Sequence, residues 1–238
     1  YTSSSGRKVV IDSDDEGNYA VDYVMWSDWF DTGTLATDNS KTWSFEEKPE
    51  KIITDLEIQY LQFLAKNQYA LTQVYSEKGT HYSFERTCAG VFFESKLFDL
   101  VAAWFDERLS SAFNLPIENG EPFQLLHYSP YEEFSAHYDT AEHVKQSSPT
   151  TKGPGHRIAT VLVYCNSVPE SAGGATEFPL VNFKVQPQKY SAIMFRSRDD
   201  QGRLVTESKH TGSLLKEGDK YVISKWLRER PMQRTFTP

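Results

Sequence analysis

The sequence contains little cysteine, no long apolar run and no concentration of basic residues. Its two cysteines, Cys88 and Cys165, are too few for a disulfide scaffold or a multi-cysteine zinc site. No apolar stretch approaches the roughly 18 residues that a membrane-spanning helix requires, so we expect no membrane span. Lysine and arginine number 25 against 33 acidic residues and form no basic stripe, so we expect no nucleic acid partner.

The acidic residues are concentrated near the N-terminus. Residues 1–50 hold eleven acidic and four basic residues, whereas the remaining sequence is close to neutral. Polar segments there favour a solvated arm, but Trp26, Trp29 and Phe30 are too apolar to stay exposed. We interpret residues 1–49 as an acidic arm with aromatic side chains that either packs on the main domain or docks a partner. The sequence does not begin with Met and shows no signal peptide, so we expect a trimmed form of the chain.

The remaining sequence, residues 50–238, has the pattern of a domain with helices first and strands after. Thr54 begins a Thr-x-x-Glu capping box, and apolar residues follow it at helical spacing. A second helix is predicted from Ser95. Short β-branched or aromatic runs then alternate with turns that contain Gly and Pro. We therefore predict a mainly β sandwich or roll over residues 120–230, supported by helices over residues 50–115.

One His-x-Asp motif is a candidate metal site. His137 and Asp139 lie in a segment that is expected to be extended, where side chains two residues apart point to the same face. His210, just before the last predicted strand, is a candidate third ligand. Two imidazoles and one carboxylate form the facial triad of non-haem Fe(II) oxygenases, which leaves three coordination positions open. The His-x-Asp motif alone is weak evidence, because it occurs by chance in many proteins.

A lysine near the end of the sequence strengthens this interpretation. Lys220 follows His210 by ten residues and begins the last predicted strand. A cation deep inside a barrel is unfavourable unless an anion neutralises it. A dicarboxylate cosubstrate that binds iron with one end would supply that anion with its other end. The alternative is a solvated lysine at a strand edge.

Residues 80–230 resemble the catalytic domain of the prolyl 4-hydroxylases, which are members of the Fe(II)/2-oxoglutarate dioxygenase superfamily. The matching stretches are FERTCAG (84–90), LPIENGEPFQLLHY (115–128), the His137/Asp139 pair, HRIATVLVYCN (156–166), GGATEFP (173–179), and His210 followed by GDKYVISKWLRE (218–229). The resemblance implies a double-stranded β-helix, or jelly roll, with supporting N-terminal helices, in agreement with the pattern above. Several oxygen-sensing relatives have an Arg eight residues after the second His, where this sequence has Gly218. The lysine two residues later is typical of the collagen-type, algal and viral branch.

The resemblance also implies the cofactors and their ligands. Fe(II), 2-oxoglutarate and O₂ would be required, with ascorbate as the reductant. The implied iron ligands are His137, Asp139 and His210. Lys220 would pair with the distal carboxylate of 2-oxoglutarate, and the hydroxyls of Tyr128 and Thr176 would donate hydrogen bonds to the same molecule. Without the resemblance, Tyr128 would be interpreted as a core tyrosine and Thr176 as a turn threonine.

The implied reaction is the decarboxylation of 2-oxoglutarate to succinate and CO₂, coupled to hydroxylation of a prolyl residue. A Pro-containing peptide suits such a site, because a polyproline II segment is already extended and loses little entropy on binding. The residues implied in peptide binding or site shape are Arg86, Arg157 and Trp226. For Arg157 the alternative is an ion pair on a strand. Residues 76–90 and 140–155 are predicted to form loops that close over the peptide.

Three departures from the family pattern affect the expected peptide preference. Phe134 replaces a Tyr three residues before the first iron ligand, Cys88 replaces a Ser, and Lys209 replaces a Leu before the second His. None of the three removes an implied ligand of iron or 2-oxoglutarate. They leave open a dioxygenase of the same scaffold that acts on another side chain or a small molecule.

Two further alternatives differ in class. A jelly-roll module that binds peptides without turnover is disfavoured by the complete ligand set. A zinc hydrolase could use two His and one Asp, but the sequence offers no general base beside them and leaves Lys220 without a role. With two cysteines and no Asn-x-Ser/Thr site, the sequence leaves both the cytoplasm and the endoplasmic reticulum lumen open.

Overall fold

The computed structural model describes residues 52–76, 79–93, 99–113, 116–140, 153–199 and 201–232. Before these it describes only the backbone of five short strands: β1 (Thr2–Ser3), β2 (Gly6–Val9), β3 (Val21–Val24), β4 (Thr34–Ala36) and β5 (Thr42–Ser44). Of these, β3 pairs with a strand of the main sheet. The division of the chain near residue 50 stays a prediction.

Two α-helices precede most of the strands. Helix α1 (Asp55–Ala65) begins with the predicted capping box, in which the Thr54 hydroxyl accepts from the Glu57 backbone N–H and the Glu57 carboxylate accepts from the Thr54 N–H. Helix α2 (Leu100–Ala112) is capped by Asp99; the predicted start at Ser95 lies outside the described residues. No helix in the described part of the chain has the length and apolar composition that crossing a membrane requires.

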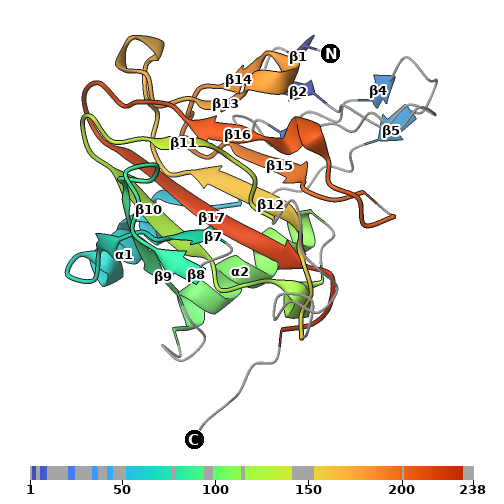
Figure 1. The fold of residues 1–238 in the computed structure, drawn as a ribbon, viewed down its shortest axis with the longest axis horizontal. Coiled ribbons are helices and arrows are strands. Elements are labelled where there is room, and N and C mark those ends of the chain that lie inside the picture. Colours follow the sequence, from blue (N-terminus) through green and yellow to red (C-terminus); the bar gives the residue numbers. More distant parts are fainter. Residues whose placement is uncertain are drawn as a thin grey trace, which may run out of the picture.

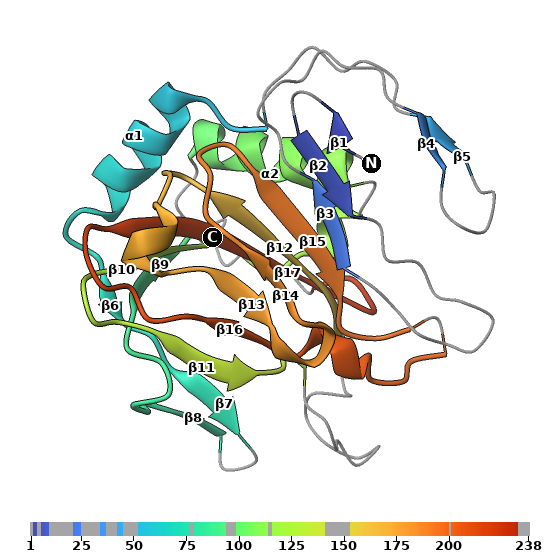
Figure 2. The same ribbon diagram turned by 90° about the horizontal axis from the view of Figure 1, so that it is seen from above.

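The strands form two main sheets. The later strands are β6 (Ala70–Leu71), β7 (Val74–Ser76), β8 (Gly79–His81), β9 (Ala89–Phe92), β10 (Gln124–Tyr128), β11 (Phe134–His137), β12 (Arg157–Tyr164), β13 (Thr176–Phe178), β14 (Phe183–Val185), β15 (Ala192–Arg196), β16 (His210–Gly212) and β17 (Lys220–Arg228). The major sheet has the order β1-β2-β3-β15-β12-β17-β10-β9-β6, and the minor sheet has the order β11-β16-β13-β14. Strands β4 and β5, and β7 and β8, form separate pairs. The predicted mainly β fold with supporting N-terminal helices is confirmed (Figures 1 and 2).

Short 3₁₀ turns connect several of these strands. They are η2 (Ile117–Asn119), η3 (Glu170–Ala172), η4 (Pro179–Val181) and η5 (Thr206–Ser208). Turn η5 directly precedes β16 and so fixes the position at which His210 enters the minor sheet.

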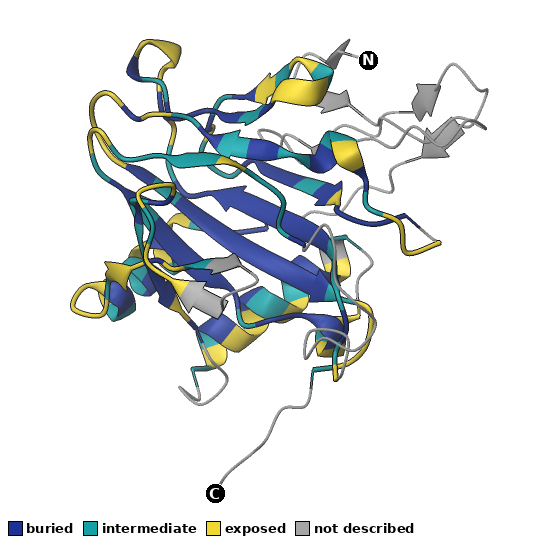
Figure 3. Cartoon of the chain, viewed as in Figure 1, coloured by how far each residue is buried: buried dark blue, intermediate teal, exposed yellow. Residues whose placement is uncertain are grey.

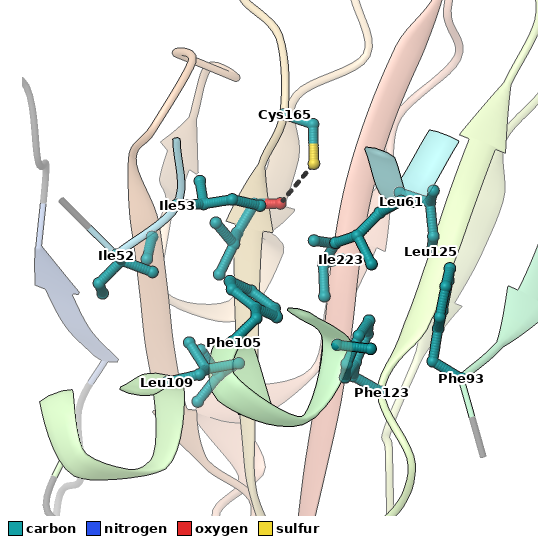
Figure 4. Packing of buried hydrophobic residues seen from close by; sticks show 14 of the residues in the cluster. Ile52, Ile53, Leu61, Phe93, Phe105, Leu109, Phe123, Leu125, Cys165 and Ile223 are labelled. Carbon is teal, nitrogen blue, oxygen red and sulfur yellow. Dashed lines mark hydrogen bonds between the residues drawn. The ribbon is translucent and has the colours of Figure 1, made fainter. Parts of the chain in front are cut away.

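The period-two alternation of the long strands produces two hydrophobic cores. On β12, Val161 and Val163 point toward the helices, whereas Leu162 and Tyr164 point between the two sheets. The first core joins α1 and α2 to the outer face of the major sheet, as Phe105, Leu109 and Ile223 show in Figure 4. The central strands are buried along most of their length (Figure 3). The helices therefore brace one face of the sheet and leave its other face to line a cavity.

Candidate active site

The three predicted metal ligands come together between the sheets. His137 ends β11, Asp139 follows two residues later, and His210 begins β16. His137 and His210 are direct cross-strand partners. One possible ligand atom from each of the three side chains lies within 4.8 Å of the others. The two imidazoles and the carboxylate of the predicted triad are therefore close enough to bind one metal ion.

A β-bulge directs His137 into this site. Strand β11 pairs with β16 at Phe134–Gly212 and at His137–His210, so three residue steps on β11 oppose two on β16. In a regular strand, residues three apart point to opposite faces, and a bulge reverses this for the residues that follow it. Phe134 and His137 consequently share a face, and their rings stack with centroids 3.5 Å apart and planes at 15°.

Hydrogen bonds to backbone carbonyls fix the tautomer of both histidines. Nδ1 of His137 lies 2.8 Å from the Ser135 carbonyl oxygen, and Nδ1 of His210 lies 2.9 Å from that of Ser208. A carbonyl only accepts, so Nδ1 donates in each ring, and in the neutral form of the ring Nε2 carries the lone pair that can bind a metal. The two Nε2 atoms lie 3.5 and 3.6 Å from the two carboxylate oxygens of Asp139.

The charge states of these groups suit a bound cation. Burial, with the neighbouring His137, lowers the pKa of His210 to about 4, so this imidazole is neutral near pH 7. Burial alone would raise the pKa of Asp139, but the two imidazoles and Arg157 outweigh it and hold that pKa well below its usual range. The neutral His210 imidazole thus faces an ionised carboxylate, an arrangement that a metal ion between them stabilises. The donor set fits Fe(II).

Thr160 was missed by the sequence analysis and contacts the Asp139 carboxylate directly. It is fully buried on β12, and its hydroxyl donates to Asp139 Oδ2 at 2.6 Å. This hydrogen bond leaves the second carboxylate oxygen, on the His137 side, to reach a metal. The signal in the sequence was a polar residue at an inward position of an otherwise apolar strand.

One cavity between the sheets contains most of the predicted site. Eight of the nine predicted site residues line it, and Arg157 is the exception. Its remaining lining residues are Leu126, Phe134, Leu162, Gly212, Val222 and Ser224. Polar groups therefore face one another across walls that are largely apolar.

Lys220 also lines this cavity. Its side chain is buried, at 2% exposure, and its Nζ sits 4.7 Å from the centroid of the Tyr128 ring. Among the described residues no carboxylate forms an ion pair with it. Burial lowers the pKa of Lys220 to about 8. A buried ammonium group without a protein anion is the feature expected where an anionic ligand binds.

Tyr128 and Thr176, whose hydroxyls are predicted to contact the same ligand as Lys220, line the cavity too. Thr176 accepts a hydrogen bond from the Tyr164 hydroxyl at 2.7 Å, which leaves its own hydrogen free to be donated. Burial raises the pKa of Tyr128 well above its usual value, so this phenol stays protonated and can donate. A side chain at Gly212 would place its Cβ 3.4 Å from the Tyr128 hydroxyl, so glycine keeps this approach open.

Two unpaired donors lie elsewhere along the cavity wall. The Arg86 guanidinium donates to the Gln124 side chain at 3.2 Å and to the Gln73 carbonyl at 3.3 Å, but its Nε has no partner among the described residues. The buried Nε1 of Trp226 likewise has no partner there. Both side chains line the cavity, although these two nitrogen atoms are themselves buried.

Arg157 lies behind Trp226 rather than in the lining. Its guanidinium stacks over the indole at 3.9 Å and bonds Glu121 through two nitrogens, at 2.6 and 2.8 Å. The ion pair with Glu121 is the alternative interpretation of Arg157, and it is present. The role of Arg157 in peptide binding stays a prediction. Parts of the two predicted closing loops, residues 77–78 and 141–152, lie outside the described residues.

Comparisons with known proteins agree with this arrangement. Residues 123–228 match the family model described as the 2OG-Fe(II) oxygenase superfamily. The chain is 31% identical over 195 residues to prolyl 4-hydroxylase 5 of Arabidopsis thaliana, covering 73% of this chain and 65% of that protein. It is 32% identical over 126 residues to a putative prolyl 4-hydroxylase of Acanthamoeba polyphaga mimivirus, covering 52% of this chain and 51% of that protein. The chain thus spans less than two thirds of these relatives.

A solved structure supports the fold. The viral collagen prolyl hydroxylase vCPH of Paramecium Bursaria Chlorella virus-1, in its complex with 2OG, superposes with a TM-score of 0.58 at 22% sequence identity. The match covers 75% of this chain and 92% of that chain. This likeness confirms the double-stranded β-helix fold. The segment matched by the family model includes the three clustered ligands and Lys220.

Proposed function

This chain belongs to the 2OG-Fe(II) oxygenase superfamily, and from that membership we propose that it hydroxylates prolyl residues in a Pro-containing peptide or protein, with release of succinate and CO₂. One observation carries the proposal. A single cavity holds a cluster of two histidines and one aspartate together with a buried lysine that has no protein counter-anion among the described residues. A metal and a dicarboxylate account for both features together.

We assign the metal to His137, Asp139 and His210. Bound Fe(II), with 2-oxoglutarate and O₂, supplies the oxidising chemistry that yields succinate and CO₂ and transfers one oxygen atom to a C–H bond. The backbone carbonyls that bind each Nδ1 hold the imidazoles with Nε2 toward Asp139. Thr160 holds one carboxylate oxygen of Asp139 in place. The ligand set is thereby oriented before any metal binds.

We assign 2-oxoglutarate to the Lys220 end of the cavity. The Lys220 ammonium neutralises the distal carboxylate, and the hydroxyls of Tyr128 and Thr176 donate hydrogen bonds to it. The apolar side chains of Leu162 and Val222 exclude water from the same space. An ion pair that is shielded from water is stronger than an exposed one, so this end fixes the orientation of the cosubstrate.

We assign the peptide to the wall that carries Arg86 and Trp226. The side chains of Arg86 and Trp226 both line the cavity, beside the metal site. Arg157, held by Glu121, supports the indole from behind. In this proposal a prolyl ring lies beside the metal site, and holding the reacting groups together in this way lowers the barrier to reaction.

Ascorbate is included in the proposal as the reductant. Ascorbate would be the external electron donor that keeps a bound iron in the ferrous state.

The proposal is tested by incubating the purified chain with Fe(II), 2-oxoglutarate, ascorbate and a library of Pro-containing peptides. We expect peptide-stimulated succinate formation and, by mass spectrometry, a gain of one oxygen atom on a proline. His137→Ala should abolish both. Oxygen gained by another side chain would support the same-scaffold alternative, and peptide binding without any succinate would support a non-catalytic module; either result would contradict prolyl hydroxylation.

A further inference from the structure

Phe134 lies beside a metal ligand without being one. Its ring stacks on the His137 imidazole with centroids 3.5 Å apart, and the Arg86 guanidinium carbon lies 4.7 Å from the centroid of the same phenyl ring. Arg86 and Phe134 are antiparallel bridge partners, so their side chains leave the same face of the sheet. The three side chains form a contiguous stack along the cavity wall.

The His137 ring is less enclosed by other side chains than the His210 ring, so its orientation depends more on the stack with Phe134. The His137 side chain is 19% exposed, whereas the His210 side chain is 7% exposed. The rings of Phe195 and Phe178 pack against His210, with centroids 4.6 and 5.8 Å from its own. A hydrogen bond to the Ser135 carbonyl holds His137 at one point, Nδ1, and leaves the tilt of the ring to its neighbours.

The bulge in β11 gives the stack a structural cause. Without the extra residue, Phe134 would point away from His137 and the imidazole would lack its flat apolar support. A ring against one face of an imidazole restricts rotation about the bond to Cβ, and that rotation moves Nε2 relative to Asp139. The interplanar angle of 15° keeps the two rings in face-to-face contact.

We propose that Phe134 is a positioning residue for His137. The phenyl ring of Phe134 fixes the imidazole plane so that Nε2 of His137 points at the metal. Arg86 contacts the same phenyl ring and holds it in place. The proposal rests on the proposed function only in taking the metal to be Fe(II). Phe134 lacks the hydroxyl that related proteins carry at this position. The stacking contact with His137 needs only the ring, so it does not depend on that hydroxyl.

The test measures Co(II) binding by the full chain without 2-oxoglutarate or peptide, by titration calorimetry and by the visible absorption of the bound ion. Phe134→Leu should weaken Co(II) affinity about tenfold and alter the absorption, as loss of outer support does at other metal sites. Phe134→Tyr, which keeps the ring, should restore the affinity. Phe183→Leu is the control, because it removes a ring from the same minor sheet outside the cavity lining.

Three results would overturn the proposal. In the first, folded Phe134→Leu binds Co(II) with wild-type affinity. In the second, Phe183→Leu loses as much Co(II) affinity as Phe134→Leu, and in the third Phe134→Tyr loses as much. If circular dichroism shows that Phe134→Leu does not fold, Phe134→Met is measured in its place with the same criteria. A wild-type chain that binds Co(II) but makes no hydroxyproline contradicts the proposed function alone, so the two failures are distinguishable.

Discussion

Tyr128 and Lys220 are direct cross-strand partners of β10 and β17, and the Lys220 ammonium group lies against the Tyr128 ring. The ring face stabilises the cation but does not neutralise it. Lys220 is therefore a buried cation, and burial lowers its pKa to about 8. This unfavourable buried charge lies at the position where a bound anion would neutralise it.

Replacing Lys220 by Met should weaken 2-oxoglutarate binding at least roughly thirtyfold, because truncation leaves the distal carboxylate buried without a partner. The measurement is a calorimetric titration of 2-oxoglutarate into chain loaded with Mn(II). Lys225→Met is a matched control on the same strand. Lys225 is also buried, but it pairs with Asp106 on the helix side of the sheet. Its replacement should lower stability and leave 2-oxoglutarate affinity unchanged; equal losses in both variants would contradict the assignment.

The same lysine should make stability depend on pH in the absence of ligand. Its pKa is about 8 when folded and about 10.5 when unfolded, so below pH 8 both states are protonated and the full cost of burial, about 3 kcal/mol, is present. Between these values the unfolded chain binds more protons, so stability rises with pH. Urea unfolding should show Lys220→Met more stable than wild type at neutral pH, with the gap closing toward pH 10.5. A gap that stays constant would show that Lys220 is not a buried cation.

Thr160→Val should weaken metal binding about tenfold while leaving the fold intact, because it removes the donor to Asp139 Oδ2 with little change of shape. The readout is Mn(II) affinity from electron paramagnetic resonance titration. Thr72→Val serves as the control, since Thr72 is buried but donates to the Cys88 carbonyl instead. Unchanged Mn(II) affinity in Thr160→Val would show that Asp139 is held by its other contacts alone.

The sequence predicts the part of this site that depends on local spacing. His137 and Asp139 share a face because they are two residues apart in an extended segment. His210 and Lys220 could be identified because their ten-residue separation matches a family pattern, and the fold class follows from helices placed before short strands. These features can be predicted without knowing which strands pair.

The remaining features depend on contacts between distant segments, which spacing does not encode. The bulge in β11 exists only relative to β16, so Phe134 could be interpreted only as a lost hydroxyl. Thr160 meets Asp139 from 21 residues away, and Arg157 meets Glu121 from 36. A charged residue at an inward strand position predicts an ion pair or a ligand contact, and only the neighbouring strands decide between them.

Glu121 is bonded by both Arg157 and Arg228, so its replacement should affect the Trp226 wall and the pH dependence of stability together. Burial would raise the pKa of Glu121, but the two arginines outweigh burial and lower it. Its stabilising effect is therefore full above the unfolded pKa, near 4.5, and disappears as the pH falls through the lower folded value.

Glu121→Gln should accordingly reduce stability by about 2 kcal/mol at neutral pH, with the difference from wild type vanishing in acid. It should also raise the KM for a Pro-containing peptide several-fold and leave the KM for 2-oxoglutarate unchanged, because Arg157 supports Trp226 and does not reach Lys220. Glu118→Gln, an exposed change three residues earlier, is the control for both measurements. A raised KM for 2-oxoglutarate, or an unchanged KM for the peptide, would show that the Arg157–Trp226 stack does not shape the peptide wall.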